Sequence, residues 1–449
     1  MFTFLKGSYL RYVFRLITAF ITRFRALIGI GIGIGIAFFF LLKFLIPVIA
    51  GMSVQKIGLT GRYNTNNLPN SILELIGDGL TKLDKSGNVE PNLAASWQTP
   101  DKGKTWIFEI KKDLVWQDGK KVTSDEISYQ FSDVVIERPD EYTIIFKLQN
   151  PYSAFPSIVS KPTFKKGLLG TGEWQVKDII LSGTNVEKIT IQNKKGGGER
   201  RIYKFYPTEE RTKLAFELGE VGAVEQLLNP APIDSWTKAT VSKVNNTGEY
   251  VAVFFNTQEG FTAEKSIRQA LTYAINKQVL GGMRAISPIS QDSWAYNPQV
   301  KPYNYDLEKA KGIIADFKKE SKSETLSINL STPPLLLAQA EKISKDWRDA
   351  GLEVNLLVTP SVPTEYQALL AIFDMPDDPD QYSIWHSTQT ATNLTKYQNP
   401  RIDKLLEDGR AEIGVEERRK IYLDFQRYLL EDAPAAFLYY PTTYSISRH

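Results

Sequence analysis

Residues 97–131 constrain the fold of this chain more than any other stretch, because they carry several local structure signals in a fixed order. Side chains in the first part alternate between two faces, and one face is predicted to hold Trp106, Phe108 and Ile110, as in a half-buried strand. Lys-Gly and Asp-Gly pairs on either side are typical of tight turns. Thr123, with Glu126 three residues later, forms a capping box that predicts the start of a helix. The stretch therefore predicts strand, turn, strand and helix.

The length and the rare residues narrow the class of protein. A chain of 449 residues exceeds what one hydrophobic core usually holds, so we expect two or more lobes. The chain has no cysteine and only two histidines, His386 and His449. Disulfides, thiolate sites, histidine triads and multi-histidine zinc sites are therefore disfavoured. We expect no metal, no cofactor and no catalytic residue.

The first 52 residues form a separate region. Basic residues precede an apolar run over residues 26–42 that continues past Lys43, and no acidic residue occurs here. About 20 apolar residues cross a bilayer, and a basic flank keeps the N-terminus cytoplasmic. The pattern predicts a single-pass membrane anchor with the rest of the chain outside the cytoplasm. A cleaved signal peptide is the alternative, although its apolar part usually covers only about 7–15 residues.

The anchor region also accounts for the basic charge of the chain. It holds six of the 54 basic residues and none of the 51 acidic ones, so the remainder carries 48 basic and 51 acidic residues. A nucleic-acid-binding protein usually carries a basic stripe on its surface. The nearly neutral remainder therefore predicts no nucleic-acid partner.

Residues 326–358 indicate the layout of the second half. Leu326, Ile328 and Leu330 alternate as in a strand, a helical pattern over 335–350 stops at Gly351, and 352–358 reads as another strand. A strand, helix, strand unit of this kind builds a parallel sheet with a right-handed crossover. The chain is therefore predicted to be an α/β protein.

Three groups of motifs resemble those of one known family. Within residues 94–126 the chain has A-A-S-W, K-G-K-T-W-I-F-E-I-K and W-Q-D-G-K-K-V-T-S-D-E. Residues 254–277 contain F-F-N-T and I-R-Q-A-L-T-Y-A-I-N-K. Residues 374–434 contain D-M-P-D-D-P-D-Q-Y, Y-Q-N-P-R-I-D-K-L-L and a helix that ends in D-A-P. Together these strings resemble the family 5 extracellular solute-binding proteins of ABC importers, which include peptide and nickel receptors.

The resemblance implies a type II, two-lobed periplasmic-binding-protein-like α/β fold behind the N-terminal transmembrane helix. It divides the chain into an anchor at 1–52, lobe I from 53–75, 166–255 and 432–449, a trimmed signature subdomain at 76–165, and lobe II at 256–431. The strands that cross between the lobes would lie near Phe255 and Phe437. The lobes would close on a small solute and present it to permease subunits, with peptide the favoured ligand and nickel or an oligosaccharide as alternatives.

The resemblance also suggests binding residues. In the peptide-binding branch, an aspartate before the Asp-Pro pair holds the α-amine of the ligand, and Asp374 matches it by position. Because this loop is one residue longer than usual, Asp377 is the second candidate. A charge-assisted pair in a dry cleft suits that task, and a solvated acidic turn is the structural alternative. Trp385 and His386 beside the loop, and Trp116, are further ligand-binding candidates, although most tryptophans fill cores.

Two other functions remain open at this stage. A hydrolase could use paired carboxylates such as Asp377 and Asp380, but nothing in the sequence sets two carboxylates at a catalytic separation. A sensory ectodomain would need a cytoplasmic output module, and only about 25 residues precede the apolar run.

Overall fold

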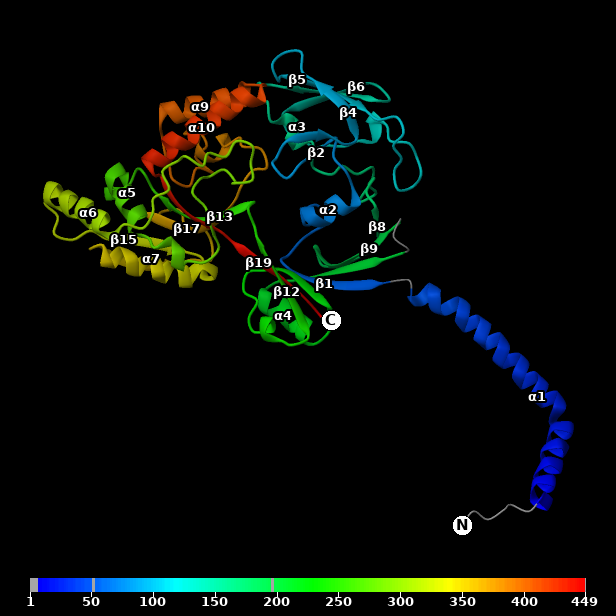
Figure 1. The fold of residues 1–449 in the computed structure, drawn as a ribbon. Helices are drawn as coiled ribbons and strands as arrows, with labels where there is room; N and C mark the ends of the chain where they lie inside the picture. Colours follow the sequence, from blue (N-terminus) through cyan, green and yellow to red (C-terminus); the bar gives the residue numbers. More distant parts are fainter. Residues whose placement is uncertain (1–6, 51–52, 195–197, 449) are drawn as a thin grey trace, which may run out of the picture.

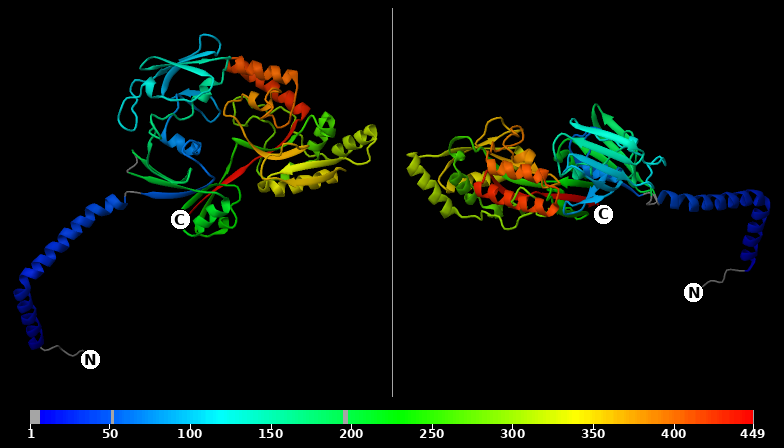
Figure 2. Two further views of the ribbon diagram at one scale, coloured as in Figure 1. Left: turned by 180° about the vertical axis from the view of Figure 1, so that it is seen from behind. Right: turned by 90° about the horizontal axis from the view of Figure 1, so that it is seen from above.

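The computed structural model describes residues 7–50, 53–194 and 198–448. Helix α1 (Gly7–Ala50) extends away from the rest of the molecule in every view (Figures 1 and 2). Among the described residues no single helix has both the length and the apolar composition to cross a bilayer. The segments Tyr12–Leu27 and Gly29–Leu41 meet both requirements only when taken together, and they are bent by 60° at their junction. The membrane anchor therefore stays a prediction.

Lobe I is built on a seven-stranded mixed sheet with the strand order β12-β19-β11-β1-β10-β9-β8. The strands are β1 (Val54–Thr60), β8 (Trp174–Ser182), β9 (Asn185–Asn193), β10 (Arg200–Tyr206), β11 (Ala223–Leu227), β12 (Ala239–Asn245) and β19 (Thr442–Arg448). One core gathers α2 (Asn70–Ile76) against β1, β9 and β10, and a second gathers α4 (Glu209–Glu217) against β11 and β19. The C-terminal strand β19 thus completes a sheet that begins with β1.

The signature subdomain contains a hairpin and a four-stranded antiparallel sheet in the order β4-β5-β7-β6. Its elements are β2 (Thr81–Leu83), β3 (Val89–Pro91), β4 (Ala94–Gln98), β5 (Thr105–Ile110), β6 (Val134–Asp140), β7 (Thr143–Leu148) and α3 (Phe155–Ile158). Trp106, Phe108 and Ile110 are buried on one face of β5, as the alternation predicts. The predicted strand is confirmed.

The helix predicted at Thr123 is wrong. Only a single 3-10 turn, Ser124–Glu126, follows it, and the Thr123 side chain makes no capping hydrogen bond. The carboxylate of Glu126 instead accepts a hydrogen bond from Nε1 of Trp116 at 2.6 Å and pairs with Lys165 at 2.6 Å. Trp116 and Lys165 thus bind the carboxylate that a capping box would need for its own hydrogen bond.

Lobe II is built on a six-stranded sheet with the order β14-β18-β13-β17-β15-β16. Its strands are β13 (Glu249–Phe255), β14 (Met283–Arg284), β15 (Ser327–Thr332), β16 (Glu353–Val358), β17 (Ala368–Asp374) and β18 (Ala435–Tyr440). Its helices are α5 (Lys265–Ala274), α6 (Leu307–Ser321), α7 (Leu337–Asp349), α8 (Tyr382–Trp385), α9 (Pro400–Ala411) and α10 (Val415–Asp432). Strands β15 and β16 are parallel neighbours in the sheet, and α7 connects them along the chain. This confirms the predicted strand, helix, strand unit.

The crossings between the lobes differ from the expected positions. Phe255 pairs with Ala368 and Phe437 with Ala252, so both lie inside the lobe II sheet. The chain instead crosses at residues 246–248, between β12 and β13, and at Pro441, between β18 and β19. Strand β13 is buried on both faces, between two separate cores, which is the environment of a central strand rather than of a linker.

Candidate functional site

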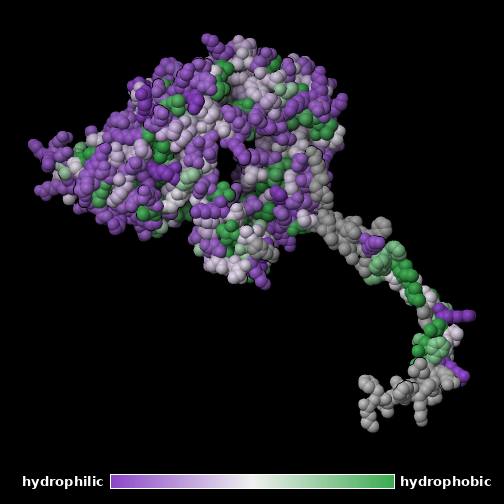
Figure 3. Space-filling view, viewed as in Figure 1, coloured by the Kyte–Doolittle hydropathy of each residue, from purple (hydrophilic) through white to green (hydrophobic). Residues whose placement is uncertain are grey.

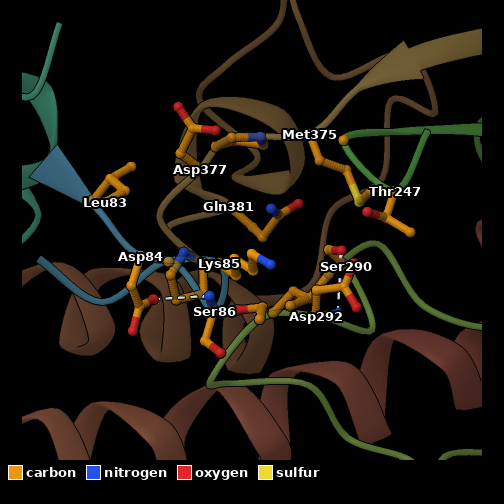
Figure 4. A pocket seen from close by; sticks show the side chains of 16 residues that line it. Leu83, Asp84, Lys85, Ser86, Thr247, Ser290, Asp292, Met375, Asp377 and Gln381 are labelled. Carbon is orange, nitrogen blue, oxygen red and sulfur yellow. Dashed lines mark hydrogen bonds between the residues drawn. The ribbon is translucent and has the colours of Figure 1, made fainter. Parts of the chain in front are cut away.

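Two cavities lie where lobe I, the signature subdomain and lobe II meet. The first, of about 160 Å³, is lined by the turn of the β2–β3 hairpin at 83–87, by the crossing residues Thr247 and Gly248, and by lobe II residues 289–293 and 375–381 (Figure 4). The second, of about 350 Å³, is lined by α2, by 77–83 and 160–162, and again by Asp377. Figure 3 shows the surface hollowed in the middle of the molecule. A ligand at this junction would contact both lobes.

Residues 374–381, here called the acidic loop, form the lobe II side of the junction. The side chains of its last two aspartates point into lobe II. Asp378 accepts from both terminal nitrogens of Arg418, at 2.6 and 3.2 Å, and Asp380 accepts from Nε of Arg410 at 3.0 Å. All three of Asp378, Asp380 and Arg418 are almost fully buried. Buried ion pairs of this kind fix the path of the loop.

Asp377 is arranged differently. It lines both cavities, and no hydrogen bond or ion pair is made by its carboxylate among the described residues. Partial burial raises its pKa, Lys161 opposes that rise, and the charge of Asp378 adds to it. A carboxylate without a partner, at the meeting point of three parts of the chain, is suited to bind a cationic group.

Glu74 faces Asp377 from helix α2 of lobe I. Both residues line the second cavity, and the pKa of Glu74 is raised by burial and, second, by the charge of Asp377. The side chains that line the two cavities include five carboxylates and three lysines: Glu74, Asp78, Asp84, Asp292, Asp377, Lys82, Lys85 and Lys161. The excess of acid favours a ligand that carries positive charge.

Asp374, the first candidate by position, is exposed at the end of β17 beside the first cavity. It lies opposite Glu249 of β13 in the antiparallel register. The pKa of Glu249 is raised by burial and then by the charge of Asp374. Asp374 and Asp377 thus each have a carboxylate neighbour, but Asp374 lines neither cavity, whereas Asp377 lines both.

The three aromatic candidates do not line either cavity. Trp385 is 1% exposed in the lobe II core, and its Nε1 donates to Oε1 of Gln381 at 3.3 Å. Trp116 is also 1% exposed, in the core of the signature subdomain. Large apolar side chains gain most from full burial, which explains both positions. Trp385 thus contacts Gln381 from the core of lobe II, and Gln381 itself lines the first cavity.

His386 is likewise buried, at 4% exposure, and it stacks on Tyr382 with ring centroids 4.1 Å apart. Its Nε2 faces α9, with Glu407 at 3.5 Å and Asp403 at 4.0 Å. His386 therefore lines neither cavity, and its role as a ligand contact stays a prediction. Asp380, one of the two carboxylates considered for hydrolysis with Asp377, forms an ion pair with Arg410 and is not free to act on a substrate.

Sequence reasoning missed Glu74, Lys161 and the β2–β3 turn as parts of the junction. The turn does carry a local signal, since Asp84 accepts from the backbone N–H groups of Ser86 and Asn88, as in an Asx-type turn. That signal predicts a turn but not which lobe it will touch. Glu74 lies on a short helix with no pattern that marks it as different from other exposed glutamates.

The fold and the junction define a class: a two-lobed α/β solute-binding protein. The sequence places it further, since the family described as "Bacterial extracellular solute-binding proteins, family 5 Middle" matches residues 88–135 and 126–393. The chain belongs to this family of extracellular solute-binding proteins.

Individual relatives agree with that assignment. The oligopeptide-binding protein AppA of Bacillus subtilis is 25% identical, over 85% of this chain and 84% of its own. The nickel-binding periplasmic protein of Escherichia coli is 24% identical, over 63% of this chain and 66% of its own. Among solved structures, NikZ of Campylobacter jejuni in complex with Ni(L-His) has a TM-score of 0.71 at 21% identity, covering 89% of this chain and 94% of its own. AppA of Bacillus subtilis in complex with a nonapeptide has a TM-score of 0.67 at 19% identity, with 89% and 95% covered.

Proposed function

We propose that this chain is the substrate-binding component of an ABC importer and captures a peptide between lobe I and lobe II. Two cavities at the meeting of the lobes support capture of a solute. The two crossings at 246–248 and Pro441 provide the hinge about which the lobes would close. A ligand that contacts both lobes shifts the population toward the closed arrangement, because only that arrangement offers all the contacts.

The proposal that the ligand is a peptide rests on the unpartnered carboxylate of Asp377. A peptide supplies an α-amine that is cationic at neutral pH, and Asp377 is the carboxylate that lines both cavities with no partner of its own. Glu74 on the opposite side adds to the negative potential. Some relatives are named for the oligopeptides or dipeptides that they bind, and these names support the same ligand class.

The membrane anchor and the orientation belong to the same proposal. Segments Tyr12–Leu27 and Gly29–Leu41 carry exposed apolar side chains along most of their length. Arg15, Arg23 and Arg25 lie within the first segment, on the N-terminal side of the apolar run over residues 26–42, and no acidic residue occurs in either segment. By the positive-inside rule the N-terminus is cytoplasmic and the lobes are outside, where a permease receives its load.

Native mass spectrometry of the full chain, purified in detergent, tests the ligand class. We expect a peptide adduct that is lost in Asp377→Asn and kept in a control, Asp424→Asn, which changes an exposed aspartate on α10 that pairs with Arg427. A glycan or metal adduct would overturn the peptide assignment. A peptide adduct that survives Asp377→Asn would overturn the role of this carboxylate.

A further inference from the structure

The signature subdomain contacts lobe II on the side of the hollow opposite the two crossings. In Figure 1 the crossings lie near β12, β13 and β19, whereas α9 and α10 meet the subdomain at the far side. Figure 2 shows the same arrangement from behind. The molecule therefore encloses its hollow between a hinge on one side and this contact, here called the dock, on the other. Contacts far from a hinge change most when the lobes separate.

The dock is made of buried polar contacts with defined geometry. The backbone N–H of Ser153 donates to the carbonyl of Arg410 at 2.8 Å, and its hydroxyl donates to the carbonyl of Gly409 at 3.1 Å. On the hairpin side, the N–H of Trp294 donates to the carbonyl of Ser86 at 3.0 Å. Ser153 is 8% exposed, so its hydrogen-bonding groups would need new partners if the dock opened.

Gly87 shows how closely the hairpin turn approaches the acidic loop. Its φ is +81°, and a Cβ added there would lie 3.0 Å from the backbone oxygen of Asp377. Only glycine combines this backbone conformation with this separation. The turn and the acidic loop therefore meet next to the proposed ligand contact.

Arg410 connects the dock to the acidic loop through a single side chain. Its Nε donates to Asp380 at 3.0 Å, and its guanidinium lies over two rings, 4.2 Å from the centroid of Tyr382 and 4.8 Å from that of Tyr152. Asp380 and Tyr382 belong to lobe II, whereas Tyr152 belongs to the signature subdomain. A planar, permanently charged guanidinium can stack and pair at once, which a lysine cannot do.

A second connection runs through the carbonyl of Gly409. This oxygen accepts both from the hydroxyl of Ser153 and from Nε of Arg418, each at 3.1 Å. Arg418 in turn holds Asp378, which is next to Asp377. Each ion pair of the acidic loop is therefore linked to a residue that the subdomain contacts. Arg410 pairs with Asp380 directly, and Arg418, which pairs with Asp378, donates to the carbonyl of Gly409.

We propose that Arg410 is a positioning residue that couples docking of the signature subdomain on lobe II to the placement of Asp377. The inference rests on the proposed function, since it assigns the dock the task of retaining the ligand. Docking completes the environment of Arg410 by adding Tyr152 and Ser153, and Arg410 holds the second half of the acidic loop through Asp380. The loop then presents Asp377 in one position, and a ligand bound there favours the docked arrangement in return.

The test measures docking directly, with and without a ligand. Because the chain has no cysteine, Lys147→Cys on β7 and Lys404→Cys on α9, both exposed, can carry a dye pair that reports the separation of the subdomain from lobe II. In this background we compare Tyr152→Leu, Arg410→Lys and their combination. The matched control is Arg427→Lys, which alters an exposed arginine that also pairs with an aspartate and lies over a tyrosine ring.

Each single variant is expected to lower the ratio of docked to undocked molecules about tenfold, which is the factor for one contact of this strength. The combination is expected to lower it little further, because both variants remove the same contact. With trialanine as the probe, the dissociation rate should rise by a similar factor. The control should change neither quantity.

Two outcomes would overturn the proposal. One is an Arg410→Lys variant with a lower melting temperature but an unchanged docked ratio, which would make Arg410 a structural residue of lobe II only. The other is full additivity of the two variants in the docked ratio. Failure of trialanine to bind would count against the peptide assignment alone, because the docked ratio is measured without it.

Discussion

The two halves of the acidic loop contain the same residue type and do opposite things. Asp378 and Asp380 are 7% and 5% exposed, and each is neutralised by an arginine from α9 or α10. The side chains of Asp374 and Asp377 stay accessible, although the surrounding protein partly desolvates Asp377, and neither pairs with a cation within the described part of the chain. One half is thus fixed in the protein, and the other is available to a ligand.

This difference identifies the binding group better than position in a motif does. A carboxylate whose charge is already balanced has little to gain from a cationic ligand, whereas an unbalanced one relieves its own repulsion by binding. The fixed half also has a use, because a loop held by two buried ion pairs presents the free half with little loss of entropy on binding.

The largest expected effect comes from unbalancing the fixed half. Arg418→Met removes the cation that holds Asp378 and leaves a buried charge without a partner. Such a change typically lowers the free energy of unfolding by about 3–5 kcal/mol. Urea unfolding followed by circular dichroism measures it.

The matched control is Arg427→Met, which breaks the exposed pair with Asp424 and should cost less than about 1 kcal/mol. Asp378→Asn in the Arg418→Met background should restore part of the loss, because the isolated charge is then gone. Equal costs for Arg418→Met and Arg427→Met would remove the contrast between the fixed half and the surface.

Changing the free half should affect binding instead of stability. Asp377→Asn removes the charge without changing the size of the side chain, and peptide affinity should fall about tenfold to a hundredfold, the range for one charge-assisted contact. Isothermal titration calorimetry with trialanine measures the affinity. Urea unfolding of the same variant should show no loss of stability relative to the parent chain, because burial and Asp378 already disfavour the ionised form. A large loss of stability would mean that Asp377 has a structural partner.

The pH dependence of binding should follow the raised pKa values of Asp377 and Glu74. Burial is the first cause of both shifts, so each carboxyl of the ligand-free protein becomes protonated at a higher pH than its ordinary value of 3.8 or 4.5. A cationic ligand binds the ionised form, so affinity is full above the raised pKa values and declines as the pH falls through them. Titrations between pH 4 and 8 check this, and affinity that rises toward low pH would contradict it.

The sequence predicts those structural features that are determined by residues close together along the chain. The alternation in β5 and the strand, helix, strand unit at 326–358 are both correct, because short-range periodicity determines them. The capping box at Thr123 is wrong because two side chains outside it, Trp116 and Lys165, bind the carboxylate of Glu126. Local rules cannot anticipate such partners.

The candidate site shows the same limit. The sequence motif locates the acidic loop, but it does not distinguish Asp377 from its neighbours, since the distinction comes from Arg410 and Arg418 on helices that are 30 or more residues away. Trp385 is adjacent to the loop in sequence and still points into the core. Proximity along the chain therefore predicts the place of the site and not the direction of each side chain.

The smallest effect is expected at Asp374, the other member of the free half. It lies opposite Glu249, and like charges that face each other across two strands are mildly destabilising. Asp374→Asn should therefore raise the free energy of unfolding by about 0.5 kcal/mol at neutral pH, and it should change peptide affinity by less than about twofold. Urea unfolding and calorimetry measure the two quantities. If Asp374→Asn weakens binding as much as Asp377→Asn does, both carboxylates of the free half contact the ligand amine, and the preference for Asp377 over Asp374 would be wrong.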